Sequence, residues 1–236
     1  MYHYYPSCTF NNLDPVSAKD LREYAKMKGM AVRACCHFDK TELTEEDMAV
    51  YFCQACRETI EKNESRNISF WEILDQDPSF VFPDYHGMEF VLQDCYRDRN
   101  HPEIHKAVRS LLTKMNIRYV ELPRNKENSD FCGTLHFETV KYADDIPSFD
   151  HISHNGKEMT KKLMEEKVEQ LQGLPVICYC GRCLNGILLG GGHPVHLMTL
   201  INNHYLGREE QLEAHALDLL SKPDPRYKMM KEKRSQ

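Results

Sequence analysis

The feature that most constrains this 236-residue chain is an internal repeat. At the offset that separates Cys8 from Cys95, residues 2–34 match the second half of the chain without a gap. In both copies an apolar or aromatic run, typical of a strand, ends near the cysteine. A proline then stands where the first residue of a helix is expected, at Pro15 and Pro102. We therefore expect two related units built in the same order.

The predicted helices also end at equivalent positions, Gly29 and Asn116. Glycine and asparagine are the residues that best tolerate the left-handed conformation at a helix end. Each predicted helix is followed by a stretch that predicts a strand, at residues 30–34 and 117–122. Matching starts and stops indicate that the repeat is not a chance similarity.

The similarity returns at residues 49–56 and 176–183, where a short apolar strand leads into a C-x-x-C motif. Two apolar segments further on, residues 70–74 and 197–201, are in register with each other. This alternation predicts an α/β fold, with two pseudo-symmetric repeats of strand–helix units and mainly parallel sheets. The C-terminal ends of parallel strands meet at one edge, where ligands bind. We expect metal sites at these strand ends because the cysteines follow the strands.

The boundary between the halves falls within residues 76–87, which hold two prolines and a glycine. We expect the first cysteine-rich repeat over residues 1–86 and the second over 87–206. The second repeat carries insertions, of which the Lys- and Glu-rich residues 156–172 predict a surface helix. Residues 207–236 are expected to form a C-terminal helix and a basic tail.

Ten cysteines in 236 residues lie below the roughly 8–10% typical of small disulfide-stapled domains. The N-terminal residues lack a basic region followed by an apolar stretch, so we expect no secretory signal and a reducing, cytoplasmic location. There, clustered cysteines are more often metal-binding or catalytic than disulfide-bonded. The net charge of −6 argues against nucleic-acid binding, and no apolar run is long enough to span a membrane.

The first half holds five cysteines at strand ends or on the loops that follow them, and we expect their thiols to gather. These are Cys8, Cys35, Cys36, Cys53 and Cys56. Five thiols are more than the four that a tetrahedral structural zinc takes. Two adjacent cysteines also cannot easily turn both sulfurs toward one small ion. The first set therefore favours a polynuclear iron–sulfur cluster.

The second half holds four cysteines in the aligned positions: Cys95, Cys132, Cys180 and Cys183. Phe131 stands in the place of Cys35, which removes one thiol. Four thiols fit zinc or a cubane four-iron cluster equally well on spacing alone. Cys178 falls opposite Tyr51, so the repeat assigns it no role, and it is either a fifth ligand or a core thiol.

This doubled pattern resembles the cysteine-rich CCG domain family, which includes the CCG-domain subunit of heterodisulfide reductase. The resemblance covers roughly residues 2–205. It implies that the first cysteine set holds a non-cubane [4Fe–4S] cluster and that the second set holds another metal, either [4Fe–4S] or zinc. It also implies reductive cleavage of a disulfide. The chain departs from the family pattern at His37, where glycine is usual, and at Phe131, where a cysteine is usual.

The leading hypothesis is an oxidoreductase subunit that acts on a small disulfide or thiol. His37 could donate a proton to a leaving thiolate, although a histidine that only fills space is the alternative. The chain has no ferredoxin cysteine run and no flavin motif, so we expect an iron–sulfur or flavoprotein partner as electron donor. The rivals are a non-enzymatic electron-transfer or redox-sensing subunit and a structural zinc protein. His193 and His196 are expected in the core or in loops.

Overall fold

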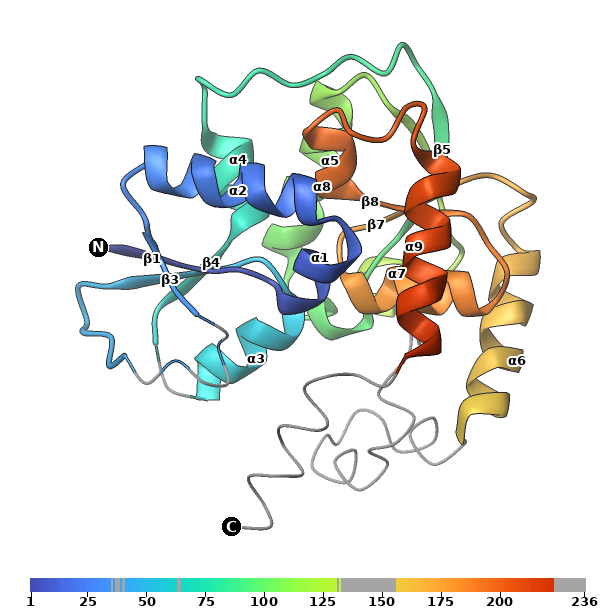
Figure 1. Ribbon diagram of the computed structural model, residues 1–236, viewed down its shortest axis with the longest axis horizontal. Coiled ribbons are helices and arrows are strands. Elements are labelled where there is room, and N and C mark those ends of the chain that lie inside the picture. The colour runs from blue at the N-terminus through green and yellow to red at the C-terminus, as the bar shows by residue number, and fades with distance from the viewer. Residues whose placement is uncertain are drawn as a thin grey trace.

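Figure 1 shows the computed structural model of the chain. The structure describes residues 1–34, 36, 39, 41–62, 65–130, 132 and 156–222. Within these residues the chain is an α/β protein with two parallel four-stranded sheets, which confirms the predicted fold class. No described helix combines the length and the apolar content needed to cross a membrane.

The first sheet has the order β2-β1-β3-β4, and every neighbouring pair is parallel. Its strands are β1 (Tyr2–Tyr5), β2 (Ala31–Val32), β3 (Met48–Tyr51) and β4 (Asn67–Ser69). The central strands β1 and β3 bury Tyr4, Ala49 and Val50. Such burial is expected because helices cover both faces of most parallel sheets.

The second sheet repeats this order as β6-β5-β7-β8, again with parallel pairs. Its strands are β5 (Glu89–Gln93), β6 (Arg118–Glu121), β7 (Val176–Cys178) and β8 (Pro194–His196). Val176 pairs with Pro194 just as Ala49 pairs with Asn67, at the equivalence that the two C-x-x-C motifs define. The repeat is therefore present in the strand order and in the register of these pairs.

Helices join the strands of both units. The first unit contains α1 (Cys8–Leu13), α2 (Pro15–Met27), α3 (Gln54–Lys62) and α4 (Phe70–Gln76). After it come η1 (Tyr96–Asp98), α5 (Pro102–Lys114), η2 (Lys126–Asn128), α6 (Gly156–Glu169), α7 (Gly181–Leu189), α8 (Leu197–Ile201) and α9 (Glu209–Ser221). As predicted, α2 and α5 begin at the two prolines, and Gly29 (φ 72°) and Asn116 (φ 52°) follow their ends in the left-handed region.

The sequence does not predict β4 and β8, because three residues are too few for a recognisable alternation. Each of these strands leads directly into a helix whose N-cap is the last strand residue. Ser69 and Glu72 form a capping box at the start of α4. At the start of α8, His196 Nδ1 accepts the N–H of Met198 at 3.2 Å. The two units thus fill the same structural position with different residues.

The two units pack against each other through equivalent elements. Helix α1 contacts α7, while η1, the counterpart of α1, contacts α3, the counterpart of α7. Likewise α4 contacts α5, while Asn202, which directly follows α8, the counterpart of α4, reaches α2. There the side-chain amide of Asn202 donates to the Ser17 carbonyl at 3.1 Å. The interface between the units is therefore pseudo-two-fold.

Helix α7 approaches α1 closely because its first residue is Gly181. A Cβ at this position would lie 2.8 Å from Cγ2 of Thr9 and 3.1 Å from Cδ1 of Leu13. Helix α9, red in Figure 1, packs against both α1 and α7. This helix lies where the sequence predicts a C-terminal helix, and the predicted basic tail lies outside the described residues.

Candidate metal centre

The central strands of both sheets end shortly before a cysteine. Cys8 follows β1 as the first residue of α1, and Cys53 follows β3. Cys95 follows β5, and Cys180 follows β7 as the N-cap residue of α7. Because parallel strands end at the same edge of a sheet, the thiols gather at the edge where ligands bind in such folds.

Three thiols of the second predicted set form a compact buried triad. The Sγ atoms of Cys95, Cys180 and Cys183 all lie within 4.8 Å of one another. The exposed fractions of these residues are 2%, 2% and 0%. Thiolates are the ligands that zinc and iron–sulfur clusters prefer. The triad can therefore bind a metal ion or a cluster.

Cys132 adds a fourth thiol to this triad. Its Sγ atom lies 3.0 Å from that of Cys183, and it accepts the backbone N–H of Tyr96 at 3.2 Å. Cys132 also forms a side-chain hydrogen bond with Cys95. The structure thus brings all four cysteines of the second predicted set into one site.

The thiol contacts continue from this site into the first unit. Cys180 is hydrogen-bonded to Cys53, which occupies the equivalent position in the first C-x-x-C motif. Cys53 is bonded in turn to Cys56, and Cys56 to Cys36. Among the described cysteines, seven form one continuous thiol network, and no two form a disulfide. The two predicted sets therefore adjoin at the pseudo-two-fold axis.

Mutual hydrogen bonding shifts the pKa values of these thiols in different directions. Hydrogen bonding, first of all with Cys183, lowers the pKa of both Cys132 and Cys180 well below its usual range. Burial, followed by the hydrogen bonds of its neighbours, raises the pKa of Cys183 well above that range. Metal binding requires thiolates, so the cysteines of this site would release their protons as a metal binds.

The rest of the first predicted set is only partly described. Cys36 is buried, and Cys8 is half-buried at the start of α1. Cys35 and His37 lie outside the described residues, so the predicted proton donor stays a prediction. Three members of the first set, Cys36, Cys53 and Cys56, thus belong to the thiol network.

Cys178, to which the repeat assigns no role, is the last residue of β7 and is fully buried. It pairs with Gln93 on one side and with His196 on the other. Burial is the first cause that raises the pKa of its thiol well above the usual range. These surroundings resemble those of a core thiol more than those of the hydrogen-bonded network.

Cys95 is supported by a series of hydrogen bonds that the sequence does not indicate. The Tyr179 hydroxyl accepts the N–H of Cys95 at 3.1 Å and donates to the Asp94 carboxylate at 3.0 Å. Arg109 donates to the same carboxylate at 2.7 Å. Tyr179 aligns with Phe52 in the repeat. The extra hydroxyl of Tyr179 is therefore the only feature of the sequence that could have indicated these hydrogen bonds. Such outer contacts orient metal ligands.

Two arginines lie where α3 meets η1. Arg97, two residues after Cys95, forms an ion pair with Glu58 of α3. Arg57, the residue after Cys56, donates to the backbone carbonyl of Arg97. The Arg97 side chain is 7% exposed. A buried guanidinium thus lies at the junction of the two cysteine-bearing units.

An aromatic shell seals the network. Trp71 packs against Phe52 at 4.9 Å and against Tyr179 at 6.3 Å between ring centroids. These two residues directly precede the first cysteines of the C-x-x-C motifs. Trp71 also contacts His196, which the sequence places in the core or in a loop and which is buried; burial lowers the pKa of His196 to about 4. Trp71 Nε1, His196 Nε2 and Gln54 Nε2 are buried donors without a hydrogen-bond partner among the described residues.

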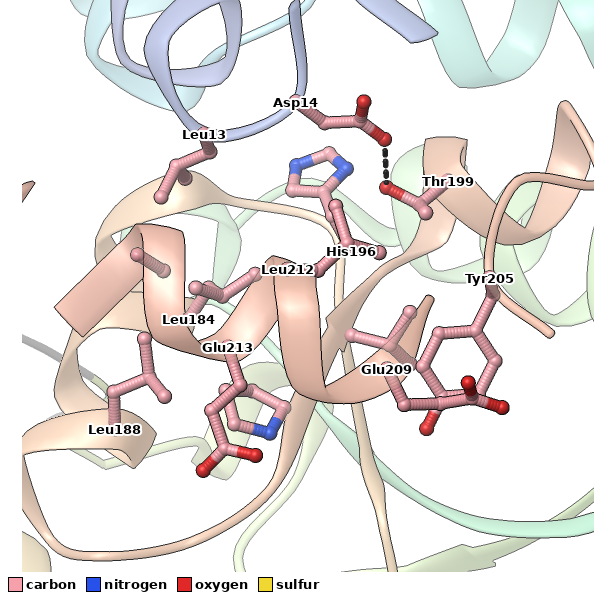
Figure 2. Close-up of a pocket in the computed structure, with 13 residues that line it drawn as sticks. Leu13, Asp14, Leu184, Leu188, His196, Thr199, Tyr205, Glu209, Leu212 and Glu213 are labelled. Carbon is pink, nitrogen blue, oxygen red and sulfur yellow. Dashed lines mark hydrogen bonds between the residues drawn. The ribbon is translucent and has the colours of Figure 1, made fainter. Parts of the chain in front are cut away.

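A cavity of about 30 Å³ lies beneath α9, lined by residues of α1, α7 and α8 (Figure 2). Thr199 donates to Asp14 at 2.8 Å at its edge, and His196 lines it. None of the described cysteines lines this cavity. Its volume suits about one water molecule, so it is too small for a disulfide substrate.

No protein-family model, curated protein or solved structure matches this chain. The class that the fold and the site define is therefore an α/β protein with a buried cysteine cluster able to hold a metal.

Proposed function

We propose that the chain is an iron–sulfur oxidoreductase subunit, similar to the CCG-domain subunit of heterodisulfide reductase, that reduces a disulfide or oxidises thiols. The observation that carries this proposal is the continuous network of seven buried thiols. A structural zinc takes four thiolates, so one such ion leaves thiols of the network unused. A [4Fe–4S] cluster also takes four cysteines, and proteins with two clusters hold two such sets, which would use a network larger than four thiols.

The surrounding donors support a sulfide-containing cluster. Trp71 packs on the residues that precede Cys53 and Cys180, and Gln54 directly follows Cys53. Their side-chain N–H groups are buried and unpartnered among the described residues. A buried donor without an acceptor is costly, and cluster sulfurs accept hydrogen bonds from N–H groups. When bound, a cluster supplies one-electron transfer.

In this proposal the two cysteine sets have different tasks. The sealed second set would hold a centre that stores or relays electrons, because its thiols are nearly inaccessible. The first set contains Cys8, the one described cysteine that is only half-buried. A substrate sulfur would approach from that side, and His37 would protonate the leaving thiolate. A partner iron–sulfur protein or flavoprotein would supply the electrons.

One observation favours a second candidate, a structural zinc site at the second set. With Zn–S bonds of about 2.3 Å, tetrahedral geometry puts thiolates roughly 4 Å apart. The 4.8 Å limit on the triad suits this spacing. In a cluster each thiolate binds a different iron, which needs wider spacing. This candidate predicts a colourless protein that is not redox-active.

Metal and sulfide analysis of protein purified without oxygen separates the candidates. Two clusters give about eight irons per chain, and one cluster beside a structural zinc gives about four irons with one zinc. Cys180→Ser is expected to lose metal from the second set, whereas Cys178→Ser, a buried cysteine outside the network, is expected to keep it. Zinc without iron in the wild-type protein would overturn the oxidoreductase proposal.

The enzymatic part of the proposal needs its own measurement. Protein reduced by a viologen donor is mixed with a small disulfide, and thiols are counted. Each disulfide takes two electrons and two protons and gives two thiols. Iron-loaded protein that transfers electrons to the disulfide supports the proposal. Iron-loaded protein that is reduced but releases no thiol from any disulfide tested would favour electron transfer alone.

A further inference from the structure

The ion pair of Arg97 and Glu58 joins the two cysteine sets. Arg97 stands two residues after Cys95, and Glu58 stands two residues after Cys56. The pair therefore crosses between the units at the contact of η1 with α3. Arg57 holds the backbone at Arg97 from the first unit. This arrangement fixes a permanent positive charge beside the thiol network.

A buried thiolate centre needs such a charge. Four thiolates leave a net negative charge on a bound zinc ion and on a four-iron cluster alike. Buried net charge is costly unless a charge of opposite sign lies nearby. The Arg97 side chain is 7% exposed, and its guanidinium is always protonated and interacts electrostatically with Cys95 and Cys180. Glu58, at 34% exposure, offsets part of its charge.

We propose that Arg97 and Glu58 are positioning residues that set the charge balance of the metal centre, and through it the metal affinity and the reduction potential. This inference rests on the proposed function, because it assumes that the cysteines bind metal. Arg97 would stabilise the reduced centre relative to the oxidised one, and the metal-loaded centre relative to the metal-free site with protonated thiols, because the first state of each pair carries the more negative charge. Glu58 would act in the opposite direction.

The repeat shows that the ion pair of Arg97 and Glu58 occurs on only one side of the pseudo-two-fold axis. Arg97 aligns with Phe10 of the first unit, and Glu58 aligns with Asn185 of the second. The pseudo-two-fold axis therefore does not generate a second copy of the pair. Phe10 and Asn185 are uncharged, so the equivalent positions place no such ion pair beside the cysteines of the other side.

Two variants that break the same ion pair give the decisive comparison. In Arg97→Gln the centre loses a positive charge, and in Glu58→Gln it loses a negative one. If the pair acts through charge, the two variants shift metal affinity and midpoint potential in opposite directions. If the pair only holds the units together, both variants shift them in the same direction. Arg97→Lys keeps the charge and is expected to behave most like the wild type.

The affinity readout is chelator competition for zinc by the reduced, metal-free chain. We expect Arg97→Gln to weaken zinc binding about tenfold or more and Glu58→Gln to strengthen it. In iron-loaded protein the potential should fall in Arg97→Gln and rise in Glu58→Gln. Lys19→Gln, which removes one partner of an exposed ion pair on α2, is the matched control and should change neither.

The outcomes distinguish the charge role of Arg97 and Glu58 from the proposed metal-binding function on which it rests. A wild-type chain that binds neither zinc nor iron overturns the proposed function and the inference with it. A wild-type chain that binds metal, with variants that shift together or not at all, overturns the inference alone. Circular dichroism identifies a variant that has not folded, and Arg97→Lys against Glu58→Gln then decides the direction of the effect.

Discussion

At the scale of single residues, the two C-x-x-C motifs differ in the residue that follows their first cysteine, Cys53 or Cys180. The cysteines occupy equivalent positions and are hydrogen-bonded to each other. The next residue is Gln54 in the first motif and Gly181 in the second. Gln54 is buried beside Arg57, to which its side-chain oxygen is hydrogen-bonded at 3.1 Å. Gly181 has no side chain, and Thr9 and Leu13 of α1 occupy the space where a Cβ atom would lie.

Gly181→Ala is therefore expected to lower the free energy of unfolding by about 1–3 kcal/mol, because the added methyl overlaps Thr9 and Leu13. Urea denaturation measures this change. The double variant Thr9→Ala with Gly181→Ala should recover part of the loss, because the closest atom is then absent. Strictly additive losses would show that the contact with Thr9 is not the cause.

Tyr179→Phe tests the hydrogen bonds that support Cys95. The variant leaves the Cys95 N–H without its acceptor, which costs about 1–3 kcal/mol of stability. It should also weaken metal retention, because these hydrogen bonds orient Cys95. Tyr85→Phe is the matched control, since the buried Tyr85 hydroxyl donates to the Leu200 carbonyl. Equal metal retention in the two variants would argue against a role for Tyr179 at the site.

The sequence could not have revealed the residues that support the site. The cysteines are visible because their chemistry and spacing are unusual, and the repeat doubles the signal. Arg97 and Glu58 lack counterparts in the repeat, and their pairing depends on contact between η1 and α3. The contact of Cys53 with Cys180 was equally hidden, because a repeat identifies equivalent positions and does not say that they touch.

At the scale of elements, local signals predicted the long helices well. Proline at the first helical position and glycine or asparagine after the end are backbone effects that act within one turn, as at Pro15 and Asn116. The short strands β4 and β8 owe their conformation to pairing with β3 and β7. Tertiary contacts of this kind leave little trace in three residues of sequence.

An element-scale prediction concerns the carboxylate that ties α4 to α2. Burial alone would raise the pKa of Asp77, but hydrogen bonds from Lys28, Tyr24 and Ser79 outweigh it and hold the pKa well below the usual range. A lowered pKa contributes stability above the ordinary carboxyl range, and this contribution is lost as the pH falls through the folded-state value. The interactions of the Asp77 carboxylate with Tyr24 of α2 and with Lys28 at the end of α2 should therefore weaken only in strong acid.

Asp77→Asn is expected to reduce the free energy of unfolding near neutral pH, and its difference from the wild type should shrink as the solution is acidified. Unfolding measured from neutral pH to about pH 2 provides the test. Asp218→Asn, in an exposed pair on α9, is the control and should leave the difference small throughout. A difference for Asp77→Asn that grows in acid would contradict the assignment.

At the scale of the whole molecule, the thiol network connects the candidate metal centre of the second unit to Cys53, Cys56 and Cys36 of the first unit. A metal that binds only the folded chain stabilises every element that must be folded to form its site. We therefore expect metal removal to lower amide-exchange protection in both sheets. Hydrogen exchange on the loaded and chelated protein measures this. A loss confined to β5, β6, β7 and β8 would show that the centre belongs to the second unit alone.

The reciprocal contacts of α1 with α7 and of η1 with α3 have a consequence for the history of the chain. An interface in which equivalent positions meet is the isologous kind that two identical copies form in a symmetric homodimer. A single ancestral unit could have made this interface with a second copy of itself. In a fused chain each side can diverge separately, and the two sides now carry Phe10 and Arg97 at the equivalent position.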